Sequence, residues 1–283
     1  MALRTVAIST KSGISAAILV AALILAAVGA VLWRAEFGSG LGPADWSAIR
    51  FTVLQAALSA LLSTMLAIPV ARALARRRFV GRGLLVTLLG APFILPVIVA
   101  VLGVLAVFGR AGWLNAALAA VGLPGITLYG LHGVVLAHVF FNLPLATRLL
   151  LQAWQTVPAE RFRLAAQLGL TPRAVFRSFE LPLLRQILPG TAAVIFVICL
   201  TSFAVALTLG GGPRATTIEL AIYQAFRFDF DLNRAALLSL VQLGLAGSTA
   251  ALALWIIPAI SLGGGQDRPP VSYTHLRAHE PLR

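Results

Sequence analysis

Charged residues are scarce in this sequence of 283 residues. Asp, Glu, Lys and Arg make up only 11% of it, whereas 59% of the residues are hydrophobic and the mean hydropathy is +0.94. A soluble domain carries about 25% charged residues, and a soluble chain this apolar could not cover its surface. The composition therefore predicts an all-α polytopic membrane protein and excludes an extracellular enzyme or a DNA-binding protein.

Cysteine and lysine are almost absent. The one cysteine, Cys199, lies inside an apolar run, which excludes a disulfide framework and a cysteine metal site. The one lysine, Lys11, follows Thr10 and does not close a glycine-rich Gly-Lys-Ser/Thr turn, so the chain has no P-loop for a nucleotide. We expect a non-catalytic chain with no metal and no cofactor. If it performs active transport, a separate subunit binds the ATP.

Six apolar segments are about 20 residues long, which is enough to cross a membrane as helices. They cover residues 14–33, 51–70, 84–108, 127–147, 187–209 and 235–257. The first lacks a small-residue cleavage site, so it is expected to be an uncleaved anchor and not a signal peptide. Pro92 and Pro96 interrupt the third, and an interfacial turn is expected at residues 122–125.

Basic residues are unequally divided between the two sides of this six-span arrangement. One side receives 13 before the C-terminal tail is counted: Arg4, Lys11, Arg72, Arg76, Arg77, Arg78, Arg82, Arg148, Arg161, Arg163, Arg173, Arg177 and Arg185. The other receives six: Arg34, Arg50, Arg110, Arg214, Arg227 and Arg234. By the positive-inside rule, both termini lie in the cytoplasm. The basic excess then serves orientation in lipid, and no nucleic-acid partner is expected.

No Asp, Glu, Lys or Arg lies in the middle of any of the six segments. Coupled secondary transporters usually hold their ion on such groups, so this class is disfavoured. His132 and His138, six residues apart, lie on different helix faces. Neutral histidines bonded within the bundle are favoured over a proton relay.

The loop at residues 157–184 is predicted to form two short helices. Pro158 and Glu160 suit the first turn of one helix, and Gly169 suits the left-handed residue that ends it. Thr171 and Pro172 then suit the start of a second helix, which we expect residues 181–182 to stop. On the first helix the small side chains of Ala165 and Ala166 leave room for close approach. Physical grounds favour a docking surface and an amphipathic helix on the membrane surface equally.

The spacing in this loop resembles the coupling loop of ABC importer permeases, which is patterned Glu-Ala-Ala, three residues, Gly, nine residues, Ile, one residue, Leu-Pro. Gly169, Leu181 and Pro182 match the spacing, and Ala165 matches the second alanine. Arg163, Leu164 and Phe179 replace the glutamate, the first alanine and the isoleucine. The resemblance implies a type I, MetI-like bundle whose coupling loop docks on an ATP-binding subunit, present in two copies. Its implied coupling residues are Glu160, Arg163, Ala165, Ala166, Gly169, Leu181 and Pro182.

A second loop, residues 209–236, combines a Gly-Gly-Gly-Pro turn, a helix capped by Thr216 or Thr217, and acidic residues alternating with phenylalanine. It is similar to the outer loop of bacterial thiamine (thiamine diphosphate) ABC transporter permeases, and the similarity extends over about residues 10 to 260. That family is usually a fusion of two six-span halves, of which this chain resembles the N-terminal one. The resemblance implies binding-protein-dependent import of thiamine, with a periplasmic binding protein, a second permease half and membrane lipid as partners. The substrate-binding residues stay undefined.

These observations divide the chain into four parts: a cytoplasmic N-terminus (1–13), the transmembrane permease domain (14–257), a cytoplasmic linker (258–270) and a tail (271–283). The tail loses all apolar periodicity and is expected to be non-native. Three alternatives stay open for the function. They are a permease for iron(III), sulfate or molybdate, an ATPase-independent channel or secondary transporter, and a structural membrane scaffold.

Overall fold

The computed structural model describes residues 10–35, 38, 40–210, 212 and 215–256, and these residues form helices joined by turns, without a strand. The N-terminal segment before residue 10, the expected linker at 258–270 and the expected tail at 271–283 lie outside the described residues. In chain order the elements are α1 (Thr10–Arg34), α2 (Pro43–Arg76), α3 (Arg82–Leu88), the 3-10 turn η1 (Ala91–Phe93), α4 (Val97–Phe108), α5 (Trp113–Ala120), α6 (Leu131–Gln155), α7 (Ala159–Gln167), α8 (Pro172–Val175), the π-helical turn η2 (Phe176–Glu180), α9 (Leu181–Leu200), α10 (Phe203–Leu209), α11 (Ile218–Arg227) and α12 (Leu232–Ile256).

Within the described residues, six segments are long and apolar enough to cross a membrane, as the sequence predicts. They are Gly13–Arg34, Pro43–Arg76, Val97–Ala120, Leu131–Gln155, Pro172–Leu200 and Leu232–Trp255. The all-α, six-span fold class is therefore confirmed. Several boundaries differ from the predicted ones, and each difference has a local cause.

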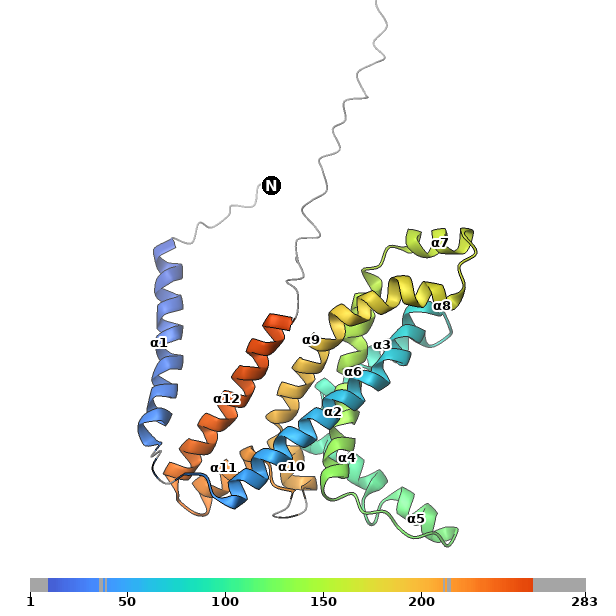
Figure 1. The fold of residues 1–283 in the computed structure, drawn as a ribbon. Helices are drawn as coiled ribbons and strands as arrows, with labels where there is room; N and C mark the ends of the chain where they lie inside the picture. The colour runs from blue at the N-terminus through green and yellow to red at the C-terminus, as the bar shows by residue number, and fades with distance from the viewer. Residues whose placement is uncertain (1–9, 36–37, 39, 211, 213–214, 257–283) are drawn as a thin grey trace, which may run out of the picture.

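The long helix α2 forms the centre of the bundle. Its 34 residues extend over about 51 Å, more than the hydrocarbon core requires, and it crosses the molecule obliquely (Figure 1). Side chains of α2, α6 and α9 form the main core, in which Ala56, Ala60 and Ala67 of α2 are buried. Lipid gives apolar helices little reason to associate, so close packing across such small side chains holds these helices together.

The outer helices are less buried. α1 lies at the edge of the molecule beside α12 (Figure 1), where its last turn and Ala35 pack on Ala236 and Leu237. No residue in the apolar stretch of α1 is buried inside the structure. This helix therefore presents nearly all its surface to lipid.

The third predicted span, 84–108, is interrupted at Pro92 and Pro96 as expected, but its bounds were wrong, because the apolar segment long enough to cross a membrane is Val97–Ala120. The structure divides it into α3, η1 and α4, with bends on either side of η1. Proline has no amide hydrogen and clashes with the preceding turn, so Pro92 and Pro96 end the helical hydrogen bonding there. At 12 residues, α4 is about 18 Å long, and the apolar segment continues into α5.

The fourth and fifth predicted spans are also shifted. The turn predicted at 122–125 is present, since Gly122 has a φ of +73°, but the non-helical segment continues to Gly130, so α6 begins at Leu131 and ends at Gln155. The fifth span is broken after Leu200: α9 ends there and α10 begins at Phe203. Elements far apart in the chain meet at the two ends of the bundle (Figure 1). We name the end that holds α7, α8 and the last turn of α2 the α7 end, and the end that holds α11 and the first turn of α2 the α11 end.

Candidate functional site

The short helix α7, at one end of the bundle, is closed at its C-terminus by paired backbone hydrogen bonds. The amide of Leu170 donates to the carbonyl of Ala165 at 3.0 Å, and the amide of Gly169 donates to that of Ala166 at 3.1 Å. This pattern needs a left-handed residue after the helix, and Gly169 has a φ of +64°. The predicted helix end at Gly169 is confirmed, and Glu160 lies in the first turn as expected.

The two sides of α7 differ in exposure. Ala165 is only 2% exposed and packs against its own chain, while Glu160, Arg163 and Ala166 are exposed. Leu164 and Leu168 also expose more than half of their side-chain area. Of the residues predicted to contact a partner, Ala165 is therefore buried beneath the helix, and Leu181 is half-buried at the start of α9. The remaining ones are exposed: Glu160, Arg163, Ala166, Gly169 and Pro182.

Aromatic contacts hold α7 against the bundle. The guanidinium of Arg76, in the last turn of α2, lies 4.4 Å from the centroid of the Phe162 ring. The ring of Phe162 also meets that of Phe179 edge to face, with centroids 6.2 Å apart. The helix is thereby attached to both α2 and η2.

The second helix of the loop begins as predicted and ends differently. Thr171 is the N-cap of α8, with its hydroxyl accepting the amide hydrogen of Ala174 at 3.3 Å, and Pro172 follows in the first turn. The prediction that residues 181–182 stop this helix was wrong. The helix continues through η2 into α9, because the amide of Leu181 donates to the carbonyl of Phe176, five residues back. This wider turn takes up Pro182, which has no amide hydrogen to donate.

A buried carboxylate that the sequence reasoning missed lies where η2 meets α9. Glu180 is 1% exposed, and its Oε2 lies 2.5 Å from the Nε of Arg72. Its Oε1 lies 3.4 Å from the Nε of Arg76 and forms an ion pair with it, without hydrogen-bond geometry. The same two arginines also stack on Phe176 and Phe162, so they join α2 to α7, η2 and α9. The signal in the sequence was a glutamate next to Leu-Pro in a chain with only nine acidic residues.

Two glutamines inside the bundle satisfy the free end of α9. Because the helix stops within the span, its last carbonyls have no helical partner. The side-chain amide of Gln55 donates to the carbonyl of Cys199 at 2.8 Å, and that of Gln242 donates to the carbonyl of Leu200 at 2.7 Å. These bonds connect the break in the fifth span to α2 and α12.

Of the two histidines predicted to be held inside the bundle, His138 is buried there as expected, whereas the prediction was wrong for His132, which is exposed at the start of α6. His138 is 3% exposed, and its ring nitrogens lie 3.3 Å from the hydroxyl oxygen of Ser59 and 2.6 Å from that of Ser202. His132 lies on another face of α6 and bonds the carbonyl of Thr127. His138 therefore joins α2 and α6 to the unwound residues between α9 and α10.

At the α11 end, a short helix packs on α2 and α12. Thr217 is its N-cap, as the sequence predicts, and the hydroxyl of Thr52 accepts the amide hydrogen of Ile218 at 2.9 Å. Arg234 of α12 donates to the buried carboxylate of Asp45 at 2.8 Å from its Nη2. These bonds join α2, α11 and α12 at this end.

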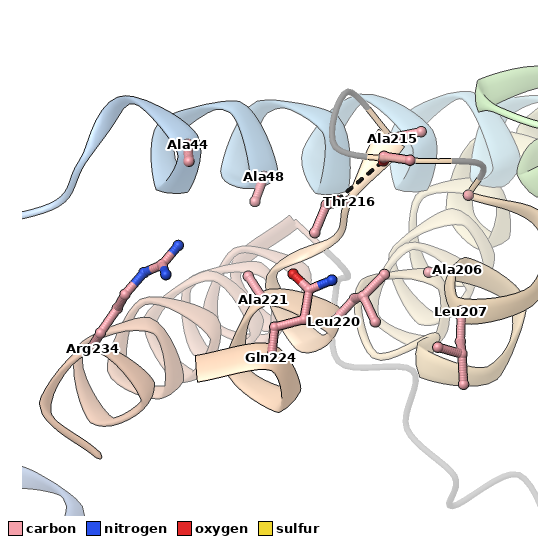
Figure 2. A pocket seen from close by; sticks show the side chains of 12 residues that line it. Ala44, Ala48, Ala206, Leu207, Ala215, Thr216, Leu220, Ala221, Gln224 and Arg234 are labelled. Atoms are coloured by element: carbon pink, nitrogen blue, oxygen red, sulfur yellow. Dashed lines mark hydrogen bonds between the residues drawn. The ribbon is translucent and has the colours of Figure 1, made fainter. Parts of the chain in front are cut away.

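A cavity of about 400 Å³ opens between α2, α10, α11 and α12 (Figure 2). Its walls are mostly small residues such as Ala44, Ala48 and Ala221, and Gln224 and Arg234 supply its larger polar groups. Figure 2 shows Arg234 reaching from α12 toward α2. Among the residues that the structure describes, no group of three or more His, Cys, Asp or Glu is placed to hold a metal ion.

Comparisons with known proteins identify relatives over most of the chain. It is 49% identical over 266 residues to the thiamine transport system permease protein ThiP of Escherichia coli (strain K12), which covers 91% of this chain and 50% of that protein. It is 51% identical over 202 residues to ThiP of Brucella abortus (strain 2308), covering 71% and 37%. The chain thus spans about half the length of the E. coli protein, and less of the Brucella one. No protein-family model matches it.

A shorter relative is covered more completely. The molybdenum transport system permease protein ModB of Mycobacterium bovis is 32% identical over 203 residues, covering 70% of this chain and 75% of that protein. Among solved structures, a bacterial alginate ABC transporter in complex with alginate pentasaccharide-bound periplasmic protein matches with a TM-score of 0.65 at 16% identity, covering 87% of this chain and 93% of the other. The MetNI methionine ABC transporter matches with a TM-score of 0.56 at 13% identity, covering 77% and 98%. These structural matches show a shared fold.

Proposed function

Because the chain belongs to the family of ABC importer permeases, we propose that it forms one six-span half of the transmembrane subunit of a thiamine importer. The observation that carries this proposal is the difference between its relatives. Identity reaches 49% to the E. coli thiamine permease over 91% of the chain, against 32% to the molybdenum permease over 70% of it. This difference favours thiamine over an oxyanion such as molybdate.

We infer that the α7 end faces the cytoplasm of a bacterial cell and that both termini lie on that side of the inner membrane. The unequal division of basic residues supports this orientation, since α7 carries Arg161 and Arg163 and the neighbouring end of α2 carries Arg72, Arg76 and Arg77. The α11 end, with its paired Asp45 and Arg234, then faces the periplasm.

We propose that α7 is the coupling helix and that an ATP-binding subunit docks on its exposed side. The implied contact residues are Glu160, Arg163, Ala166 and Gly169, with Leu164 and Leu168 beside them. Ala165 supports the helix from below, and Leu181 and Pro182 lie where the loop joins α9. ATP is bound by two copies of that partner, and the permease itself catalyses no covalent step.

The contacts of α7 suggest how its displacement by the ATP-binding subunit would be transmitted to the transmembrane helices. Phe162, Arg76 and Glu180 connect α7 to α2 and η2, and the helix then continues into α9 up to the break at Leu200. A rigid connection of this kind suits a transition in which whole helices tilt together between inward-open and outward-open states. A periplasmic binding protein would deliver thiamine to the α11 end, and a second permease half, fused or separate, would complete the pathway.

The test is uptake of radiolabelled thiamine in a strain from which the natural locus has been deleted. The strain is complemented either with the complete locus or with this 283-residue chain alone. We expect uptake from the complete locus, dependent on its ATPase gene, and none from the chain alone, because half of the pathway is missing.

Three other results would contradict parts of the proposal. Uptake that is unaffected by the deletion removes thiamine as the substrate, and molybdate, sulfate and iron(III) become the ligands to test. Uptake that survives loss of the ATPase gene indicates a channel or a secondary transporter. Uptake restored by the chain alone removes the need for a second half.

A further inference from the structure

One carboxylate in the described part of the chain is half-buried without a basic partner. Glu219 lies in the first turn of α11, and no Arg, Lys or His among the described residues forms an ion pair with it. Asp45, Glu180 and Asp229, by contrast, are each paired with arginine. The carboxylate of Glu219 accepts a hydrogen bond from the amide of Phe203, at the start of α10.

Aromatic side chains line a cavity beside this carboxylate. A cavity of about 400 Å³ is lined by Phe203, Glu219, Ile222, Tyr223 and Phe226. The rings of Phe203 and Tyr223 meet edge to face with centroids 5.1 Å apart. On α11 the lining residues lie three, four and seven positions after Glu219, so they form one stripe of the helix. Phe226 is 58% exposed, so the cavity is open on this side.

A carboxylate among aromatic faces is suited to a cation. The ring faces carry partial negative charge and attract a nearby cation, most strongly where water is displaced. The other cavity beside α11, shown in Figure 2, has in its wall Arg234, which is paired with Asp45 and Asp229, and it is lined by no aromatic ring. Of these two cavities, the one at Glu219 combines a carboxylate that has no basic partner with aromatic rings.

The position of the cavity fits a transport pathway. Phe203 is the first residue of α10, directly after the unwound residues Thr201 and Ser202 that separate it from α9. Transporters commonly bind substrates where a membrane helix is interrupted, because the free backbone groups and the kink leave room there. Glu219 contacts the structure at this interruption through the amide of Phe203.

We propose that Glu219, with the rings of Phe203, Tyr223 and Phe226, forms a binding site for an organic cation. The site deepens the proposed function and rests on it for the identity of the substrate, because the thiazolium ring of thiamine carries a permanent positive charge. An oxyanion would be repelled by Glu219, so the site also separates the two substrate classes represented among the relatives.

The first experiment measures the chemical labelling of Glu219 in the complete wild-type transporter, purified in lipid nanodiscs. Dicyclohexylcarbodiimide reacts with protonated carboxyl groups in apolar surroundings, and mass spectrometry of the peptides measures the labelling of Glu219. We expect thiamine and tetraethylammonium to protect Glu219, while thiochrome, the uncharged oxidation product of thiamine, does not. Asp229, which is exposed, serves as the control and is expected to show no protection.

Equal labelling of Glu219 with and without both cations overturns the site, as does equal protection by thiochrome, which would indicate recognition of a flat ring without its charge. Equilibrium dialysis with radiolabelled tetraethylammonium gives a second readout that does not depend on labelling. Loss of tetraethylammonium binding is expected in the variant Glu219→Gln, and unchanged binding contradicts the site.

The second experiment measures thiamine uptake in cells that carry the complete locus. Glu219→Gln keeps a side-chain oxygen for the amide of Phe203 and removes the charge, so we expect the KM to rise about tenfold while the transporter still inserts. Tyr223→Leu keeps apolar volume without a ring and is expected to raise the KM as well. The control Asp229→Asn removes a negative charge from the same end and should change the KM by less than about twofold.

The two experiments separate failure of the site from failure of the proposed function. Protection of Glu219 by tetraethylammonium without thiamine uptake by the wild type leaves the site in place and removes thiamine as the substrate. Normal thiamine uptake by Glu219→Gln, without protection in the wild type, leaves the function in place. In that case the aromatic stripe of α11 is an anchor at the membrane interface.

Discussion

At the scale of single residues, polar groups inside the bundle connect helices at the points where the helices are interrupted. Gln55 and Gln242 bond the last carbonyls of α9, and His138 bonds Ser202 in the unwound segment that follows. A buried carbonyl without a partner costs about 1–3 kcal/mol, so each of these side chains stabilises the break itself. The break between α9 and α10 is therefore stabilised by specific hydrogen bonds.

Gly133 of α6 is a residue whose size is restricted by its neighbour. A Cβ atom at this position would overlap the carbonyl oxygen of Leu128. We expect Gly133→Ala to lower the free energy of unfolding by about 1–3 kcal/mol, because the backbone of residue 128 has to move. The thermal midpoint of the purified permease measures this loss. Gly103→Ala in α4 is the matched control, since a Cβ there meets no atom within 4 Å. Equal midpoints for the two variants would contradict the prediction.

Glu219 gives a prediction for pH. Burial raises the pKa of its carboxyl above the ordinary value of 4.5, and the hydrogen bond from the Phe203 amide opposes the rise. The folded state thus holds this proton more tightly than the unfolded state, and its stabilising effect is complete below pH 4.5 and lost as the pH rises through the raised pKa.

Cation binding has the opposite dependence, because it needs the charged carboxylate. We expect the binding of tetraethylammonium, whose own charge is fixed, to weaken as the pH falls through a range above 4.5. Equilibrium dialysis at a series of pH values measures the change. A midpoint at or below that of an ordinary glutamate would be inconsistent with burial of the group. The small residual binding of Glu219→Gln should not vary with pH.

The sequence indicated some of these residues and concealed others. Gly169, Thr171 and Thr217 were predicted because a helix end needs a particular residue type at a particular place, and that requirement is local. Glu180 was missed because its partner comes from a distant segment, since Arg72 lies 108 positions before it. Glu219 was missed because its contact with Phe203 of α10 forms only in the folded chain, although Tyr223 and Phe226 follow Glu219 on the same helix. A chemical role that depends on such contacts is not visible in the spacing of one segment.

At the scale of elements, the connection between the loop and the fifth span is one continuous helix with a π-helical turn. Sequence reasoning expected two separate pieces here, because Leu-Pro commonly ends a helix. It did not foresee that an extra residue in η2 would accommodate the missing amide of Pro182. For the third span, by contrast, the interruption at Pro92 and Pro96 was predicted, and the error lay in the bounds of the membrane-crossing segment.

Deleting Ser178, an exposed residue of η2, tests whether this turn sets the direction of the loop. Removal of one residue would rotate α8 and α7 by about 100° relative to α9, which would separate Phe162 from Arg76. We expect normal insertion into the membrane and loss of thiamine transport per ATP hydrolysed, measured in proteoliposomes. The substitution Ser178→Ala keeps the length of the turn and should leave this ratio unchanged. A normal ratio after the deletion would show that the register of η2 is unimportant.

At the scale of the whole molecule, helices from distant parts of the chain meet at both ends of one oblique central helix. The six spans and the excess of basic residues on one side were predictable from the sequence, because the length of an apolar run and the charge of a loop are properties of single segments. The packing of α11 on α2 was not predictable, since the bond between Ile218 and Thr52 joins residues 166 positions apart. Movement of α2 would therefore change the helix contacts at both the α7 end and the α11 end.

The exposed side of α7 is the surface on which we expect the ATP-binding subunit to dock in the assembled transporter. Ala166 is exposed on α7 and has a small side chain, so Ala166→Trp would block a surface that docks there while leaving the buried Ala165 and the turn at Gly169 intact. We expect co-purification of the ATP-binding subunit and thiamine uptake to fall together, with membrane insertion unchanged. Val80→Trp is the matched control, because Val80 is fully exposed at the same end and lies outside the coupling loop. If Ala166→Trp keeps its ATPase partner and its uptake, then α7 lies on the membrane surface as an amphipathic helix, and the push that drives transport has to enter the bundle elsewhere.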